Sequence, residues 1–257
     1  MTGPTEGTRL AGAVVLVTGA TSGIGRALVP RLVAADARVV ASGRDTDRLA
    51  ELADTCAGVF AADLAAPGAG RQLAERVLDR WGRVDALVCA AGVGWAGEFS
   101  AMPDARVDAL VQVNLRAPIE ATRVLLPGML AHGGHLVYVT SIAGRLGVAE
   151  EAVYAATKAG LDTFAESLRL ELTGAGVRVS VVVPGVVDTP FFARRGRPYQ
   201  RRRPRPVPAD RVARALTSAL AGERPEVYVP GWLRLPVAVR ALVPALYRRL
   251  AGRFGGP

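Results

Sequence analysis

Apolar and polar stretches alternate along the chain in a pattern that predicts strands and helices in turn. The first apolar run, at 13–18, is continuous, as expected for a strand covered on both faces. A helical pattern follows from Ser22 to about Ala35. The order then repeats, with strands expected at 39–42, 57–61, 84–89, 135–140, 177–183 and 226–229 and helices at 45–55, 69–81, 105–131, 152–173 and 208–221.

Strands that alternate with helices predict right-handed crossovers and a parallel sheet. We therefore expect an α/β fold, a doubly wound parallel sheet in three α/β/α layers. The 257 residues are 50% apolar, enough for a sizeable core. We expect a single domain over 1–231, with an Arg-rich loop at about 190–207, and an amphipathic C-terminal tail over 232–257.

Composition narrows the location and the chemistry. No apolar run reaches the roughly 18 residues of a membrane span, and the first ten residues lack the features of a secretory signal. We therefore expect a cytoplasmic protein. Two cysteines and two histidines are too few for a disulfide framework or a typical zinc site, so no metal is expected.

The net charge of +9 is very uneven along the chain. Residues 1–189 hold 17 Lys+Arg and 20 Asp+Glu, a balance of −3, whereas 190–257 hold 15 and 3, a balance of +12. Of the 32 cationic residues, 31 are arginine. Lys158 is the only lysine and Asn114 the only asparagine. Because the chain otherwise uses arginine wherever a cation will serve, these two positions are candidates for a specific chemical role.

A glycine-rich turn follows the first strand and opens the first helix. Glycines in this context allow a tight turn and a close approach of backbone N–H groups to a pyrophosphate, which the helix N-terminus also favours. The turn therefore predicts a dinucleotide-phosphate site. Its candidate residues are Gly19, Thr21, Ser22, Gly23, Ile24 and Gly25.

Tyr154 and Lys158 lie four residues apart, on one face of the expected helix 152–173. A phenol is a poor proton donor at neutral pH, and a neighbouring cation stabilises the phenolate. We therefore expect Lys158 to lower the pKa of Tyr154 toward the working range.

Together these motifs resemble the short-chain dehydrogenase/reductase family, whose glycine fingerprint is TGxxxGIG. The resemblance covers residues 13 to about 190 and implies a Rossmann-like fold and an NAD(P)-dependent oxidoreductase acting on CH–OH or C=O groups. Ser141 lies 13 residues before Tyr154, the usual interval in the family. The resemblance implies cofactor contacts for Asp63, Ala91, Gly92, Tyr154, Lys158, Pro184, Gly185 and Thr189 and a catalytic set of Asn114, Ser141, Tyr154 and Lys158.

The resemblance implies hydride transfer between a nicotinamide and a carbonyl or carbinol carbon. Tyr154 would protonate the forming alkoxide, Ser141 would orient the carbonyl, Lys158 would bind the nicotinamide ribose and Asn114 would support the proton relay. One segment departs from the family: Cys89-Ala90-Ala91-Gly92 stands where Asn-Asn-Ala-Gly is usual. The amide hydrogen bonds that those asparagines make across the sheet are therefore missing.

The end of the second strand favours NADP(H) over NAD(H). It carries no carboxylate for a ribose 2′-hydroxyl, and Arg44 follows it directly. Asp45 comes next and weighs against this choice. The NADP(H) preference suggests reduction, and the aromatic and aliphatic residues Trp95, Phe99, Leu146, Phe191 and Phe192 suggest a mainly apolar ketone.

The resemblance also implies a homodimer or homotetramer formed through the helices at 105–131 and 152–173. The arginine-rich string at 194–205 is expected to be an exposed loop and supports a second hypothesis, a nucleic-acid-binding or regulatory protein on a dinucleotide-binding fold. The intact catalytic set makes nucleic acid the less favoured partner.

The tail is amphipathic. Leu235, Val239, Leu242, Val243, Leu246 and Leu250 recur at the offsets of one helical face. Pro236 suits a helix start, and Pro244 must kink or end the helix. The apolar face either packs on the domain or a second subunit, or binds peripherally to an anionic membrane surface.

Overall fold

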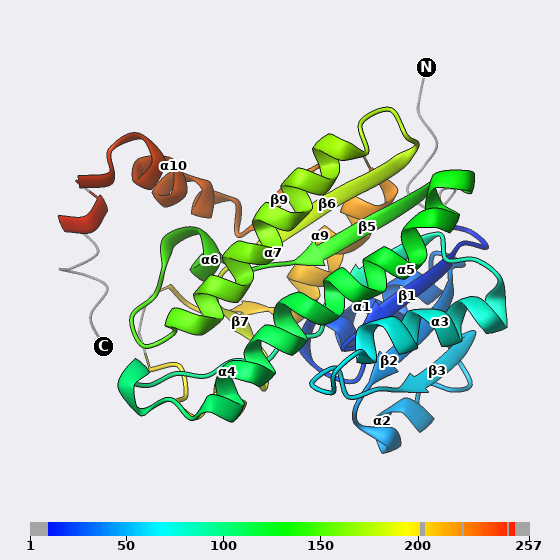
Figure 1. Ribbon diagram of the computed structural model, residues 1–257, viewed down its shortest axis with the longest axis horizontal. Helices are drawn as coiled ribbons and strands as arrows, with labels where there is room; N and C mark the ends of the chain where they lie inside the picture. The colour runs from blue at the N-terminus through cyan, green and yellow to red at the C-terminus, as the bar shows by residue number, and fades with distance from the viewer. Residues whose placement is uncertain (1–9, 201–203, 223, 246, 250–257) are drawn as a thin grey trace.

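Seven parallel strands form the centre of the molecule in a computed structural model that describes residues 10–200, 204–222, 224–245 and 247–249. Their order in the sheet is β3-β2-β1-β4-β5-β6-β9 (Figure 1). Two further short strands, β7 and β8, pair beside it. The strands are β1 (Val14–Thr18), β2 (Arg38–Gly43), β3 (Gly58–Ala61), β4 (Ala86–Cys89), β5 (Gly134–Val139), β6 (Val177–Pro184), β7 (Val187–Asp188), β8 (Val207–Pro208) and β9 (Glu226–Val229).

Helices cover both faces of the sheet and complete the expected three-layer, doubly wound architecture. One apolar cluster joins the sheet to α3 (Ala69–Trp81), α5 (Ala117–His132) and α7 (Ala152–Glu171). A second cluster on the opposite face joins it to α1 (Gly23–Val33), α2 (Thr46–Ala50) and α9 (Ala209–Ala221). Burial on both sides explains why β1 is apolar at every position before its terminal Thr18.

The order of the strands reverses between β1 and β4, the neighbours at the centre of the sheet. Chain crossovers leave this point in opposite directions, so a crevice forms outside the carboxyl ends of the strands. The glycine turn, Arg44, Asp63, Gly92, Ser141 and Pro184 follow or end strands at this edge, and Tyr154 begins a helix there. The fold therefore gathers them at one place.

Two expected helices differ from the prediction. The helix expected at 105–131 is interrupted, because α4 (Asp104–Val111) and α5 are joined by a π-helical turn, Gln112–Arg116, which contains Asn114. The helix expected at 45–55 is only five residues long. Leu49 is its only buried residue, and so little burial cannot extend a short helix.

The arginine-rich segment is more ordered than predicted. It begins with α8 (Phe191–Arg194) and ends at β8, and Arg195 is buried with 9% of its surface exposed. The expectation of an exposed loop is wrong at this residue, because an ion pair with Glu151 offsets the cost of burying its charge. Arg201, Arg202 and Arg203 lie outside the described residues.

The tail forms a short 3₁₀ turn, η4 (Gly231–Leu233), and then α10 (Arg234–Leu242), which begins two residues before Pro236 and ends before Pro244. Its apolar face is not packed as a core face: Leu235 is 67% exposed and Leu242 is 82% exposed. Leu246 and Leu250 lie outside the described residues. Within the described ranges, no helix is long and apolar enough to cross a membrane.

Candidate active site

A single large cavity, about 1750 Å³, runs along the carboxyl edge of the sheet. It extends from the glycine turn to the start of α7 and brings together most of the residues singled out from the sequence. Gly25 and Asn114 do not line it, and neither do the expected wall residues Trp95 and Phe99. The expected residues that do line it are Gly19, Thr21, Ser22, Gly23, Ile24, Arg44, Asp63, Ala91, Gly92, Ser141, Tyr154, Lys158, Pro184, Gly185 and Thr189.

Two glycine positions of the turn, Gly19 and Gly25, have no room for a side chain. A Cβ on Gly19 would lie 2.7 Å from the Cα of Ala91, and φ at Gly19 is +72°. A Cβ on Gly25 would collide with the carbonyl of Gly19, so Gly25 serves the packing of helix against turn and not the cavity wall. The turn opens α1, an 11-residue helix whose N-terminal N–H groups favour an anion. A dinucleotide pyrophosphate fits this cradle.

Two arginines, Arg44 and Arg48, line the cavity after β2. Nη1 of Arg44 lies 3.8 Å from Oδ1 of Asp63, and both side chains are more than half exposed. Arg48 also lines the cavity, and its Nη1 donates to the carbonyl of Thr21 at 3.2 Å. Asp45 caps α2 and pairs with Arg48 at 3.3 Å. Arg48 was not among the residues predicted from the sequence, although its place four residues after Arg44 was a usable signal.

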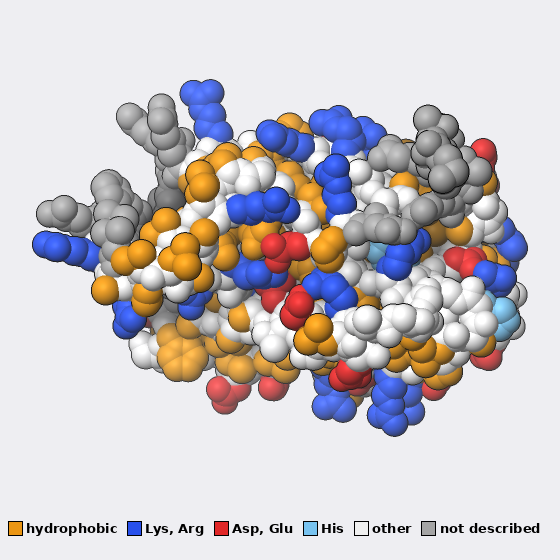
Figure 2. All heavy atoms as spheres, turned by 90° about the horizontal axis from the view of Figure 1, so that it is seen from above, with side chains coloured by type: hydrophobic (Ala, Val, Ile, Leu, Met, Phe, Trp, Pro, Cys, Tyr) orange, Lys and Arg blue, Asp and Glu red, His pale blue; other side chains and the backbone are white. Residues whose placement is uncertain are grey.

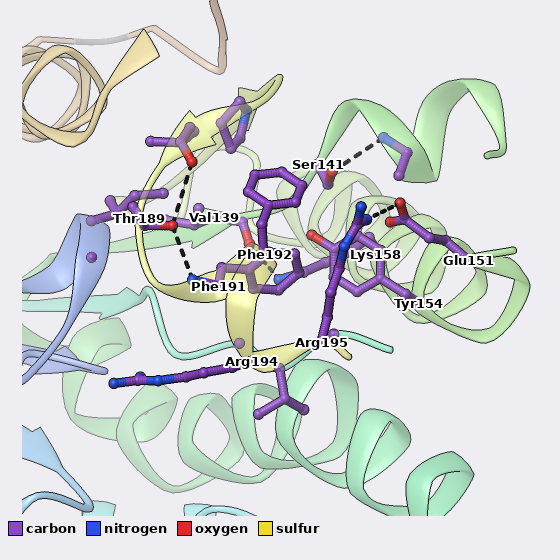
Figure 3. A pocket seen from close by; sticks show the side chains of 18 of the residues that line it. Val139, Ser141, Glu151, Tyr154, Lys158, Thr189, Phe191, Phe192, Arg194 and Arg195 are labelled. Atoms are coloured by element: carbon purple, nitrogen blue, oxygen red, sulfur yellow. Dashed lines mark hydrogen bonds and ion pairs between the residues drawn. The ribbon is translucent and has the colours of Figure 1, made fainter. Parts of the chain in front are cut away.

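Ser141, Tyr154 and Lys158 lie together at the other end of the cavity (Figure 3). Ser141 follows β5 and caps α6 (Ile142–Leu146), its Oγ accepting from the amide of Ala143 at 3.1 Å. Tyr154 and Lys158 lie one turn apart on α7 and are both buried. The Ser141 hydroxyl lies near enough to that of Tyr154 to act on the pKa of the phenol, and Nζ of Lys158 donates to the carbonyl of Val139 at 2.9 Å.

Burial dominates the electrostatics of this cluster. It raises the pKa of Tyr154 to about 12, against the lowering effect of the neighbouring Ser141 hydroxyl. The expected lowering of the Tyr154 pKa is therefore not observed, since the ammonium of Lys158 is directed to a backbone carbonyl. Burial also lowers the pKa of Lys158 to about 8, although Asp162, one turn further along α7, acts in the opposite direction.

Asn114 lies behind the cavity wall, fully buried. Its Oδ1 accepts from the amide of Val93 at 2.9 Å, and its Nδ2 donates to the carbonyl of Val93 at 2.9 Å and to Oγ1 of Thr157 at 3.2 Å. One side chain thus ties the segment after β4 to α7. A Cβ on Gly92 would lie 3.5 Å from both Asn114 Oδ1 and Lys158 Nζ, so the Gly92 backbone closely approaches this end of the cavity.

Thr18 bridges β1 and the segment after β4, where this chain has Cys89 in place of the usual asparagine. Its hydroxyl donates to the carbonyl of Val88 at 3.4 Å and accepts from the amide of Ala91 at 3.2 Å. The Cys89 side chain is buried, and burial raises the pKa of its thiol to about 12. The strands are therefore still linked by a side chain at this point.

An aromatic row begins at Tyr154 and covers the reacting end of the cavity. The ring of Phe191 lies 5.4 Å from that of Tyr154, Phe192 lies 5.4 Å from Phe191, and Tyr199 lies 5.3 Å from Phe192. Figure 3 shows the two phenylalanines of α8 beside Tyr154. These rings make the cavity wall around Tyr154 largely apolar.

Three arginines hold this cover in place. Arg195 pairs with Glu151, which precedes α7, and its guanidinium lies 4.6 Å from the centre of the Phe192 ring. Arg197 pairs with Glu150, and Arg194 reaches across the cavity to donate to Oγ of Ser22 at 3.2 Å. These contacts use cationic groups that the nucleic-acid hypothesis requires to be free. No feature of the sequence alone identified Arg195 or its partner.

A second ion network braces α6. Arg145 bonds to Asp162 of α7 at 2.7 Å and to Glu226 of β9 at 2.6 Å. Among the described residues, no group of three or more His, Cys, Asp or Glu side chains is placed to hold a metal ion.

Comparisons with known proteins agree with this geometry. A family profile described as short chain dehydrogenase matches residues 13–200. The chain is 40% identical to L-xylulose reductase of Bos taurus over 187 residues, which cover 71% of this chain and 75% of that protein. It is 38% identical to ketoacyl reductase HetN of a Nostoc strain over 191 residues, covering 70% of this chain and 66% of that one. The matched part thus spans slightly less than two thirds of HetN.

Solved structures extend the likeness over nearly the whole chain. A short-chain dehydrogenase/reductase from Burkholderia phymatum in complex with NAD superposes with a TM-score of 0.83 at 25% identity, over 93% of this chain and 96% of that one. A metagenomic short-chain oxidoreductase in complex with NADP gives 0.72 at 34% identity, over 86% and 97%. With its parallel sheet, its glycine turn and these relatives, the chain belongs to the short-chain dehydrogenase/reductase family.

Proposed function

We propose that the protein is an NADP(H)-dependent oxidoreductase that reduces a mainly apolar ketone to a secondary alcohol. One observation carries the proposal: the side chains of Ser141 and Tyr154 lie together at the end of a cavity that begins at the glycine turn. Two hydroxyls at one point suit a carbonyl oxygen. The cavity beyond them suits a dinucleotide, which would supply the hydride when bound.

The side chains divide the remaining work. Ser141 donates to the substrate carbonyl and fixes its orientation, and Tyr154 gives its phenolic proton to the oxygen as that atom becomes an alkoxide. With its pKa raised to about 12, the phenol of Tyr154 is protonated at neutral pH, and it is still a stronger acid than the alcohol whose alkoxide it protonates. Lys158, in contact with the Val139 carbonyl, binds the nicotinamide ribose. Asn114 keeps Val93 and α7 at a fixed separation behind them.

The preference for NADP(H) rests on two arginines. Arg44 and Arg48 both line the cavity after β2, and Asp45, the carboxylate next to them, is engaged as the cap of α2. A 2′-phosphate would be drawn to two cations at this point, whereas a free ribose hydroxyl would gain little from them. A relative in complex with NADP and another in complex with NAD are both similar to this chain.

The apolar character of the substrate rests on the cavity wall around Tyr154. Phe191, Phe192, Leu146 and Val148 all line this end of the cavity. A substrate that reaches Ser141 and Tyr154 therefore passes mainly aromatic and aliphatic surface.

We expect the protein to assemble as a homodimer or homotetramer through α4, α5 and α7. Exposed apolar side chains on these helices are consistent with a subunit contact: Val111 is 39% exposed, Leu130 is 47% and Leu170 is 69%.

The proposed function is tested with a panel of ketones and alcohols, each assayed with both cofactors by the absorbance of the reduced nicotinamide. We expect NADPH-dependent reduction of bulky apolar ketones and a smaller kcat/KM with NADH. Activity only on charged or sugar substrates would contradict the substrate class. Equal kcat/KM for the two cofactors would contradict the preference for NADP(H).

A further inference from the structure

The apolar side chains of α10 have two different surroundings. Pro236 and Val239 line the cavity, and Leu233, just before the helix, is buried in the core. Next to Val239 on the same apolar face, Leu235 and Leu242 are 67% and 82% exposed. A surface helix ordinarily buries its apolar residues, so these two exposed leucines depart from the usual pattern.

The protein holds this segment at the mouth of the cavity. The guanidinium of Arg240 donates to the carbonyl of Arg145, and the hydroxyl of Tyr247 donates to the carbonyl of Leu146 at 2.8 Å. Both carbonyls belong to the end of α6, the short helix that Ser141 caps. The exposed apolar face therefore lies next to the opening that leads to Ser141 and Tyr154.

The surroundings of the exposed face are strongly cationic. From Gly231 to the end of the chain the sequence contains five arginines and no aspartate or glutamate. Arg234, Arg240 and Arg248 are exposed, and Figure 2 shows Lys and Arg side chains among hydrophobic ones over the end of the molecule that carries α10. Exposed apolar side chains bordered by arginines suit an anionic lipid surface, where the apolar groups enter the acyl boundary and the arginines meet the headgroups.

The same charges disfavour a second copy of the chain as the occupant. In a two-fold contact each patch meets itself, so arginines would face arginines with no carboxylate of this segment between them. Such a contact would bury Leu235 and Leu242, but the repulsion between the arginines would oppose it. Anionic lipid headgroups instead neutralise the arginines while the leucines enter the boundary with the acyl chains.

We propose that the outer face of α10, with Trp232, Leu235, Leu242 and Val243, docks on an anionic membrane surface, and that apolar ketones enter the cavity from that surface. Trp232 is 51% exposed and also lines the cavity, so it lies on the path between the two. The part of this inference that concerns the substrate rests on the proposed function; the docking does not.

The test is cosedimentation of the full chain with vesicles of phosphatidylglycerol or of phosphatidylcholine. We expect salt-sensitive binding to the first and little to the second. The double variant Leu235→Gln/Leu242→Gln removes two exposed leucines that do not line the cavity and should weaken binding about tenfold or more. The variant Phe99→Gln, which changes an exposed apolar side chain that does not line the cavity, should bind as the unchanged protein does.

Several results would overturn the proposal. They are equal sedimentation with both vesicle types, no sedimentation with either, and undiminished binding of the α10 variant. A change in particle mass of the α10 variant, measured by light scattering, would instead identify the face as a subunit contact. Vesicle binding without reduction of any ketone would leave the docking standing and reject the proposed function, so the two failures are distinguishable.

Discussion

At the scale of single residues, the two amino-acid types that occur only once in this chain indicated where the site lies, but not how each residue acts. The only lysine and the only asparagine both lie at the reacting end of the cavity or directly behind it. Their spacing could be predicted from the sequence. Their electrostatics could not, because the depth of burial that shifts the pKa values of Tyr154 and Lys158 depends on segments distant in the sequence.

Asn114 has a structural role that can be measured. Replacement of Asn114 by alanine leaves the amide and carbonyl of Val93 without their side-chain partner. Because unpaired buried polar groups are costly, we expect the free energy of unfolding to fall by about 2–4 kcal/mol in Asn114→Ala. Urea denaturation measures this change. An unchanged midpoint would mean that Asn114 does not brace the fold.

Lys158 should give the protein a distinctive dependence of stability on pH. Its pKa is about 8 when folded, against 10.5 for an unperturbed lysine. Between these values the unfolded chain holds the proton that the folded chain has released, so stability rises with pH in this window. Relative to Lys158→Met, the unchanged protein should gain roughly 1–3 kcal/mol between neutral pH and the upper end of that window. A constant difference across this range would contradict a desolvated ammonium.

The cofactor preference is also decided by individual side chains. Arg44→Ala and Arg48→Ala should each lower kcat/KM for NADPH about tenfold and leave that for NADH nearly unchanged, since a 2′-phosphate loses a charged partner in each case. Arg71→Ala, at an exposed arginine outside the cavity lining, is the matched control. Equal losses with both cofactors would assign the two arginines to general stability of the site.

At the scale of elements, the hydrophobic pattern predicted the strands well. Each core strand lies within one or two residues of its expected range, because a parallel sheet buried on both faces requires continuous apolar runs. The π-helical turn at Asn114, the helix α8 and the outward face of α10 could not be predicted. All three depend on contacts between distant segments, such as Asn114 with Val93 and Arg195 with Glu151.

The cover formed by α8 should depend on the buried pair of Arg195 and Glu151. Arg195→Gln removes the buried cation that pairs with Glu151 and should lower stability by about 3–5 kcal/mol. It should also raise KM for the ketone, because Phe191 and Phe192 lose their support. The pair Arg197–Glu150 is more exposed, so Arg197→Gln should cost about 1 kcal/mol or less. Equal effects of the two substitutions in urea denaturation and in KM would contradict the importance of the buried pair.

At the scale of the whole molecule, the reversal of strand order between β1 and β4 brings the two ends of the proposed reaction site to one cavity. Within the basic last quarter of the chain, residues of α8 and α10 line that cavity. We expect light scattering to give two or four times the 26.8 kDa of one chain. A monomer at assay concentration would contradict assembly through α4, α5 and α7.

The central claim, that Tyr154 donates the proton in a ketone reduction, is tested most directly by Tyr154→Phe. A single preparation of this variant is assayed for ketone-dependent oxidation of NADPH and, separately, for NADPH binding by calorimetry. The account predicts a loss in kcat of about 10²–10⁴-fold with an unchanged dissociation constant for NADPH, because only the phenolic proton is removed. Retention of ketone-dependent NADPH oxidation by Tyr154→Phe would contradict it.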